Sequence, residues 1–509
     1  MVRTLVVLAV GGCSTQLVER RACQTDDECQ QAFDQGAICL DDGYCSGGSV
    51  GPVVDGVSAE IVRTVGLVDV SGSLQDLGIG MRDGVSAALA AWNNENPDKR
   101  QFVHEVRDDR YDPEQSVSLA DDLTVDAEDG QGRYAFAVLG SMGSPTSNAM
   151  LGLLNERQVP LFGTYSGATH LRRDPPDRIV WNTRASYRLE GETITRHLVS
   201  RDPNPIAGQN VFVFAQSPID SPTDGQADAA PDAVGADQVA LDAYGNSGYR
   251  GIVDVLTPLL GTQVDIPLAT YRATSTNTSV AESFFFQWIA GLVKRTPGPQ
   301  VDPEGLRVGI AMVPVASTAT PFIREIIDGF EQLRAGEKPN SLTEAEWALV
   351  TEKRKAELMK AEVVFASISP VGDQLGSNLE AAGASTYCNR DYPIIVSQVV
   401  PFPTGGSTGA LQFRSDLEAY DVNLTPGFVN FEGWIAGRVW ASAVDATGEE
   451  LTVDRLIDTL SDPDFEVDLG VGSIFRFSTN DHDGSDAVYG SVLSTSCQYE
   501  DFFFDGPRR

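Results

Sequence analysis

The sequence is poor in positive charge, and this scarcity limits what the protein can bind. Its 509 residues include 37 Lys and Arg against 72 Asp and Glu, which gives a formal net charge of -35 at pH 7. Nucleic acids and anionic membrane surfaces are bound through basic patches, so this charge argues against both partners. The scarcity of lysine fits either a salty habitat or a bias in base composition.

The start of the chain has only a short apolar run. Thr4 to Val10 is too short to cross a bilayer as a helix. With Arg3 before it and Gly-Gly-Cys after it, the run is typical of a bacterial lipoprotein signal. We expect residues 1–12 to be a signal peptide and Cys13 to carry lipid after cleavage. A mis-set start codon with a truncated signal is the alternative.

Cysteine is also scarce, with seven in the chain, and six remain if Cys13 carries lipid. Four of these fall in a short acidic segment without histidine, too small to form a core, so we expect two disulfides in a cysteine-rich segment over residues 13–48. Zinc is the alternative, but no C-x-x-C occurs. The last two cysteines are far apart and can form a third disulfide. The disulfide candidates are Cys23, Cys29, Cys39, Cys45, Cys388 and Cys497.

After a flexible linker over residues 49–57, strand-like and helix-like apolar patterns alternate along the chain. This alternation predicts parallel sheets with helical crossovers, in two successive series. Strands are expected at 61–70, 102–109, 134–140, 160–166 and 179–183, and then at 210–216, 264–271, 307–314, 362–369 and 393–402.

Two segments interrupt the second series. Residues 217–237 are rich in Asp, Ala and Pro and predict a mobile loop. Residues 341–362 predict one strongly charged helix, opened by a capping box of Ser341 and Glu344. We interpret both as surface insertions.

Motifs of catalysis and of cofactor binding are hard to find. No G-x-S-x-G, H-E-x-x-H or P-loop occurs, and the four histidines stand in unrelated contexts. The segment "STNDHDGSD" (478–486) begins like a calcium loop, but it lacks the final glutamate that such a loop needs. The sequence therefore predicts no enzyme, no cofactor and no metal site.

Two loops at predicted strand ends are better candidates for a binding site. "VLGSMGSPTSNAM" (138–150) and "TYSGATH" (164–170) place small hydroxyl residues where open α/β sheets bind ligands. Ser144, Thr146 and Thr169, with the N–H groups of Gly167, Ala168 and Thr169, can cradle a carboxylate without any arginine. The alternative is that Ser144 only caps its helix.

Several segments in this order resemble a known family. "GLVDVSGSLQDLGIGMRDGVSAALAAWN", "YDPEQSVSLADDL", the two loops above, "DAYGNSGYRG", "PIIVSQVVPFP" and "FEGWIAGRVWASAV" follow one another from about residue 61 to the end. Together they resemble the type I periplasmic binding proteins of the leucine/isoleucine/valine family, the substrate-binding lipoproteins of ABC transporters. The resemblance implies an α/β fold with two doubly wound parallel-sheet lobes joined by a hinge.

The resemblance also implies roles for individual residues. Ser144 matches the serine that binds the ligand carboxylate, and Ala168 and Thr169 match the loop that contacts carboxylate and ammonium. Tyr244 matches the tyrosine that closes over the ligand, while Leu77 stands where the family often has an aromatic residue.

Two features of the family pattern are missing. The acidic residue that grips a ligand ammonium is not evident, and its region offers only Ser369 and Asp373 as candidates. The family disulfide beside the serine is absent, because Gly143 replaces the cysteine.

The implied function is capture of an amino acid, or a similar small carboxylate or amide, for an ABC importer, by a lipid-anchored receptor in the periplasm. A sensory or surface interaction lipoprotein with the same fold but no transport is the alternative. The expected domains are lobe 1 at 58–185 and 402–470, and lobe 2 at 186–401 and 471–509.

Overall fold

The computed structural model describes most of the chain from residue 55 onward. The signal peptide, Cys13, the cysteine-rich segment and residues 218–237 of the acidic loop lie outside the described residues. Those described are 55–127, 132–200, 205–217, 243–261, 266–272, 277–295, 306–340, 342–348, 350 and 352–504.

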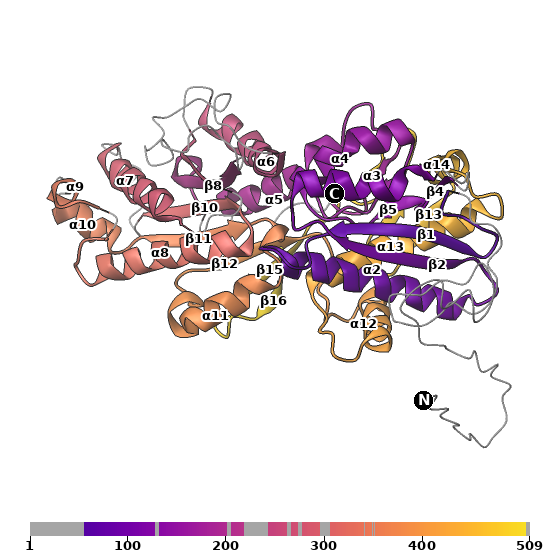
Figure 1. The fold of residues 1–509 in the computed structure, drawn as a ribbon. Coiled ribbons are helices and arrows are strands. Elements are labelled where there is room, and N and C mark those ends of the chain that lie inside the picture. The colour runs from indigo at the N-terminus through magenta and orange to yellow at the C-terminus, as the bar shows by residue number, and fades with distance from the viewer. Residues whose placement is uncertain are drawn as a thin grey trace, which may run out of the picture.

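The first lobe contains a parallel five-stranded sheet in the order β2-β1-β5-β6-β7. Its strands β1 and β2 run side by side in Figure 1. Nearly every residue of β1 is buried, as a central strand covered on both faces requires. The strands are β1 (Ile61–Val68), β2 (Gln101–Asp108), β5 (Ala137–Leu139), β6 (Leu161–Phe162) and β7 (Val180–Trp181), and a small hairpin pairs β3 (Asp126–Ala127) with β4 (Gly132–Arg133).

Helices from the beginning and end of the chain complete this lobe. The helix α13 lies along α2 so closely that a Cβ on Gly84 would come within 2.0 Å of the Asn430 carbonyl oxygen. Trp181, Trp434 and Trp440 fill the core beneath them. The helices are α2 (Gln75–Glu95), α3 (Pro113–Thr124), α4 (Ser144–Arg157), α12 (Thr408–Tyr420), α13 (Phe428–Thr447) and α14 (Val453–Ser461).

The second lobe contains a seven-stranded sheet in the order β16-β15-β12-β11-β10-β8-β9. Its first five strands in sequence are parallel, and β15 and β16 add an antiparallel edge. The strands are β8 (Val211–Ser217), β9 (Leu268–Arg272), β10 (Arg307–Val313), β11 (Glu362–Ser367), β12 (Ile394–Gln398), β15 (Tyr489–Leu493) and β16 (Tyr499–Phe502). The ten predicted strands of the two series are all present, and the predicted fold class is confirmed.

Helices cover the second sheet, and a disulfide links one of them to the turn between β15 and β16. Cys388 ends α11 and is bonded to Cys497, between β15 and β16. The pairing of these two cysteines, left open by the sequence, is therefore present. The helices are α5 (Tyr187–Ser200), α6 (Ala243–Leu260), α7 (Ser279–Arg295), α8 (Ala316–Arg334) and α11 (Gln374–Tyr387).

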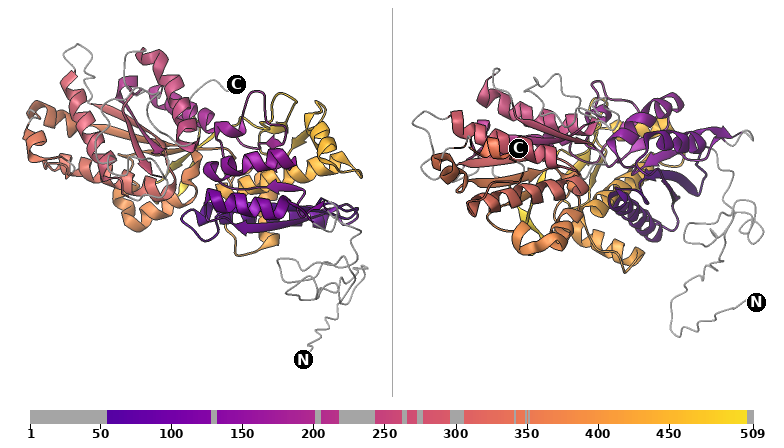
Figure 2. Two further views of the ribbon diagram at one scale, coloured as in Figure 1. Left: turned by 45° about the horizontal axis from the view of Figure 1, so that its top comes forward. Right: turned by 60° about the vertical axis from the view of Figure 1, so that its left-hand side comes forward.

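The chain crosses between the lobes after β7, after β12 and before β15, so that both lobes are built from separate stretches of sequence (Figure 2). The first and third crossings lie side by side, since the Asn182 N–H donates to the His482 carbonyl at 2.9 Å. The hairpin of β13 (Glu466–Asp468) and β14 (Ile474–Arg476) packs Phe475 into the core of lobe 1. The boundary therefore falls after this hairpin rather than at residue 470, because pairing with β13 keeps β14 on the first lobe.

The predicted single helix over 341–362 is wrong. The structure has two short helices, α9 (Glu344–Ala348) and α10 (Glu352–Leu358), and β11 already begins at Glu362. Leu342, Val350 and Leu358 are buried in the core of lobe 2. Burial of these three apolar side chains on that core outweighs the helical preference of the charged residues in the segment.

Candidate functional site

The candidate site lies where the two lobes meet. One cluster of buried side chains joins residues of lobe 1, including Leu77, Tyr165 and Ala168, to Tyr244 and Ile368 of lobe 2. The contacts cross the interface at several points, so the structure shows the lobes closed on one another. Of the site residues expected from the sequence, Leu77, Ala168 and Tyr244 belong to this cluster.

Leu77 is positioned by a carboxylate at the end of β1. The Asp69 side chain accepts hydrogen bonds from the N–H groups of Ser71 and Leu74, at 3.2 and 2.9 Å, and so folds the turn that precedes α2. Leu77, on the first turn of that helix, reaches the other lobe, where a Cβ on Gly372 would come within 2.7 Å of its side chain. Leu77 is therefore part of the interface between the lobes.

The start of α4 depends on a backbone conformation that suits glycine. Gly143, the N-cap, has a φ of 105°. The Ser144 hydroxyl that follows is buried and lies 2.8 Å from the Ser166 hydroxyl. Thr146 is also buried, but its hydroxyl donates to the Met142 carbonyl at 2.6 Å, within its own turn. Of these two hydroxyls, only that of Ser144 faces the neighbouring loop.

The loop from Ser166 to Thr169 forms the next wall. Gly167 and Ala168 are buried, whereas Thr169 is exposed at the rim. The Thr169 N–H donates to the Ser247 hydroxyl of α6 at 3.0 Å, which links this loop to lobe 2. The Arg172 side chain donates to the carbonyl oxygens of Ser166 and Ala168 and holds the loop from behind.

Tyr244 is the lobe 2 residue of the expected site that lies in the buried cluster between the lobes. It is buried, its hydroxyl donates to the Pro314 carbonyl at 2.9 Å, and its ring packs edge-on against Tyr187 at 5.0 Å. Burial raises the pKa of Tyr244 well above its usual value, so this phenol stays neutral.

A buried cluster of charges, which the sequence analysis missed, occupies the first crossing. The Arg184 guanidinium donates to Glu190 at 2.9 Å, to the Ser369 hydroxyl at 2.7 Å and to Glu432 at 3.1 Å. It also lies over the rings of Tyr165 and Tyr187, about 5 Å from each ring centre. Arg184 thus joins α5 and the short turn at Ser369–Val371, which follows β11, in lobe 2 to α13 in lobe 1.

The two carboxylates of this cluster are held differently. Glu190 also accepts from the Ser369 N–H at 2.8 Å and from the Ser397 hydroxyl at 2.7 Å. Glu432 has Arg184 as its only hydrogen-bond partner within the described part of the chain. Burial raises the pKa of Glu432 to about 7, although Arg184 acts to lower it. Burial lowers the pKa of Arg184, but its acidic neighbours reverse this effect, so its pKa is raised overall and its charge is permanent.

The remaining candidate acid, Asp373, caps a helix in the structure. Its carboxylate accepts from the N–H groups of Phe428 and Val429, at 3.0 and 3.4 Å, and so caps α13 of the other lobe. Ser369, the other candidate in that region, contributes its hydroxyl to the Arg184 cluster instead.

One sign of the missed cluster is visible in the sequence. The segment "VWNTRASYRLEG" (180–191) puts an arginine and a glutamate six residues apart directly after a buried strand. Charged residues so close to a strand end can be buried only in pairs. The identity of the second acid, in α13, has no comparable signal.

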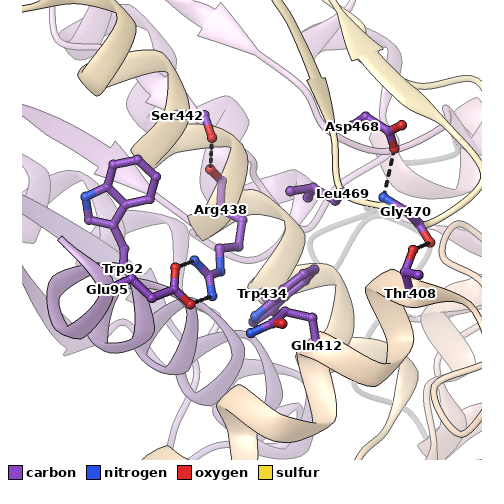
Figure 3. A pocket seen from close by; sticks show the side chains of 10 residues that line it. All are labelled: Trp92, Glu95, Thr408, Gln412, Trp434, Arg438, Ser442, Asp468, Leu469 and Gly470. Carbon is purple, nitrogen blue, oxygen red and sulfur yellow. Dashed lines mark hydrogen bonds and ion pairs between the residues drawn. The ribbon is translucent and has the colours of Figure 1, made fainter.

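A separate cavity of about 490 Å³ lies on lobe 1, away from the interface (Figure 3). Trp92 and Glu95 of α2 face Trp434 and Arg438 of α13 across it, and the loop at Gly470 closes one side. Arg438 is engaged there, with both Nη atoms within 2.8 Å of the Glu95 carboxylate. None of the site residues expected from the sequence lines this cavity.

Neither a metal cluster nor a membrane-spanning helix is found in the part of the chain that the structure describes. Its His, Cys, Asp and Glu residues form no group of three or more that could hold a metal ion. None of its helices is both long enough and apolar enough to cross a bilayer.

The fold, with its two parallel-sheet lobes and three crossings, has counterparts among known proteins. Residues 62–278 match the family model described as periplasmic binding protein. A search of curated proteins found no match.

Solved structures share this fold over nearly the whole chain. A possible leucine/isoleucine/valine-binding protein from Rhodopirellula baltica SH 1 is 21% identical, with a TM-score of 0.63 over 88% of this chain and 97% of that chain. A fatty acid ABC transporter substrate-binding protein from Thermomonospora curvata is 14% identical, with a TM-score of 0.61 over 91% and 95%. A solute-binding protein from R. palustris, in complex with benzoate, is 15% identical, with a TM-score of 0.58 over 87% and 96%.

The resemblance to the type I periplasmic binding proteins is therefore confirmed. The fold is that of substrate-binding proteins of ABC transporters.

Proposed function

We propose that this protein captures a small carboxylate-bearing solute between its two lobes and delivers it to an ABC importer. The observation that carries the proposal is the convergence of buried polar groups from both lobes at one interface. Ser144 and the Gly167–Thr169 loop approach from lobe 1, and Tyr244 and Ser369 approach from lobe 2.

A carboxylate fits this interface better than a neutral or cationic group. The start of α4 provides partial positive charge, and the adjacent loop provides further N–H groups. An amino acid is within this class, with Glu190 and Glu432 as the acids that could meet its ammonium group.

The cellular setting is part of the proposal. The signal-like start of the sequence and Cys13 support a receptor that is anchored by lipid in the cell envelope, with an ABC permease as its partner. A sensory role without transport would use the same captured solute. The two roles are distinguished by whether cells that lack the protein still take up that solute.

A thermal-shift screen of the purified protein tests the proposal. The panel holds amino acids, aliphatic and aromatic carboxylates, and the primary amide of each carboxylate. A ligand at 100 times its dissociation constant stabilises the fold by about 2.7 kcal/mol. This stabilisation is measured as a clear rise in melting temperature. We expect hits among the carboxylates. No response from any compound would contradict solute capture of this class and favour the role in surface interaction.

A further inference from the structure

The Arg184 cluster contains one carboxylate that is firmly held and one that is not. Glu190 is fixed by four donors: the Arg184 guanidinium, the Ser369 N–H and hydroxyl, and the Ser397 hydroxyl. Glu432 faces the same guanidinium from the opposite lobe, at 3.1 and 3.5 Å from Nη1, and has no other donor in the described chain. Glu432 is therefore the group that another anion can replace.

Arg184 lies beside the loop that is proposed to hold the solute. Its guanidinium lies over Tyr165, directly before the loop that includes Ser166, Gly167 and Ala168. Arg172 further ties that loop to the Arg184 backbone, at 2.9 Å from its carbonyl oxygen. An anion held at this loop is thus beside a fully buried cation whose ion pairs reach both lobes.

Charge balance limits how such an exchange can occur. Arg184 is buried with two acidic neighbours, and adding a third ionised carboxylate to this space would carry a large desolvation cost. If Glu432 binds a proton as the solute enters, the cluster keeps the same net charge. The proton comes from solvent, and no covalent bond changes.

We propose that Arg184 receives the carboxylate of the captured solute, which displaces the Glu432 side chain, and that Glu432 takes up one proton as it is displaced. This inference rests on the proposed function and deepens it, because it makes Arg184 the determinant of specificity for an anion and makes capture depend on pH.

The surroundings of Glu432 support a proton on this group. Its pKa of about 7 is raised by burial and by Glu190, against the effect of Arg184. Tyr165 and Tyr187 stay neutral, because burial raises the pKa of both. The other charged groups that face the cluster are Arg172 and, near Tyr165, Asp373.

The test uses the carboxylates and matching amides of the screen, restricted to compounds without an amine, so that the ligand itself does not titrate between pH 6 and 9. For a carboxylate that binds, we expect a dissociation constant that does not change with pH below pH 6.5. Above pH 7.5 the dissociation constant should increase by about tenfold per pH unit. Calorimetry in two buffers of different ionisation enthalpy should show uptake of about one proton at pH 8.

Two variants and a control separate the cluster's role from its effect on folding. Glu432→Gln keeps the Arg184–Glu190 pair and should bind with no dependence on pH from 6 to 9. Arg184→Met should weaken carboxylate binding by about a hundredfold or more. Arg188→Met, which removes an exposed arginine on the adjoining helix α5 paired with Asp254, should leave binding unchanged. If Arg184→Met does not fold, the pH dependence of binding by Glu432→Gln, compared with that of wild type, still tests the exchange.

The outcomes distinguish this inference from the proposed function. Binding of a carboxylate with no pH dependence, or with the same dependence in Glu432→Gln, would overturn the exchange and leave solute capture intact. Equal affinity for a carboxylate and its amide would overturn it as well. If the wild-type protein binds nothing in the panel, solute capture and the exchange both fail.

Discussion

At the scale of single residues, two neighbouring hydroxyls on α4 have different tasks. Ser144 is the first residue of the helix and faces Ser166 across the site, whereas Thr146 bonds to carbonyl oxygens of its own turn. The sequence offered both as ligand contacts, because small hydroxyl residues at a helix start look alike without their partners. Because the two hydroxyls point in different directions, Thr146→Ala is a matched control for Ser144→Ala.

We predict that Ser144→Ala weakens binding of the captured carboxylate by about 1–3 kcal/mol, the contribution of one hydrogen bond to a charged group. Isothermal titration with the best ligand of the screen measures this loss. Thr146→Ala is the control, and it should leave affinity nearly unchanged while lowering the melting temperature. Equal affinity of Ser144→Ala and wild type would show that Ser144 only serves the helix end.

At the scale of elements, one helix start is capped from across the interface. The Asp373 carboxylate, at the end of the loop before α11, accepts from two N–H groups at the start of α13. Helix starts leave such N–H groups without partners, and an acidic cap also interacts favourably with the helix dipole. These bonds exist only while the lobes are closed, so they stabilise the closed state.

We predict that Asp373→Ala shifts the protein toward the open state by about 1 kcal/mol, the usual loss for an N-cap. Small-angle X-ray scattering of the protein without ligand should then give a larger radius of gyration than for wild type. Glu380→Ala, at an exposed position of the same helix α11, is the control. A radius unchanged by Asp373→Ala would mean that the cap does not contribute to closure.

At the scale of the whole molecule, the disulfide between Cys388 and Cys497 links parts of lobe 2 that are 109 residues apart. Between these cysteines the chain leaves lobe 2, builds α12, α13 and α14 of lobe 1, and returns. A crosslink over so long a loop reduces the freedom of the unfolded chain and thereby favours the fold.

We predict that the double variant Cys388→Ala with Cys497→Ala loses about 2–5 kcal/mol of unfolding free energy. Urea denaturation followed by tryptophan fluorescence measures this loss. Ligand affinity should stay the same, because neither cysteine contacts the interface residues described above. An unfolding midpoint equal to that of wild type would show that the bond does not stabilise this protein.

Local sequence patterns determined the repeated unit of this fold. Strand positions, the parallel arrangement and the loops that carry Ser144 and Ala168 follow from apolar periodicity and from glycine and hydroxyl residues at strand ends. These signals act within a few residues of one another, so they can be read without knowing the rest of the molecule.

Only the tertiary structure decided which distant groups meet. Arg184 finds its partners 6, 185 and 248 residues away, in Glu190, Ser369 and Glu432. The break in the helix predicted over 341–362 was likewise decided by the core on which its apolar residues pack. In the first case the deciding free energy comes from burying charged groups in pairs, and in the second from burying apolar surface on a distant sheet. Both depend on contacts between residues far apart in the sequence, so they leave no local pattern.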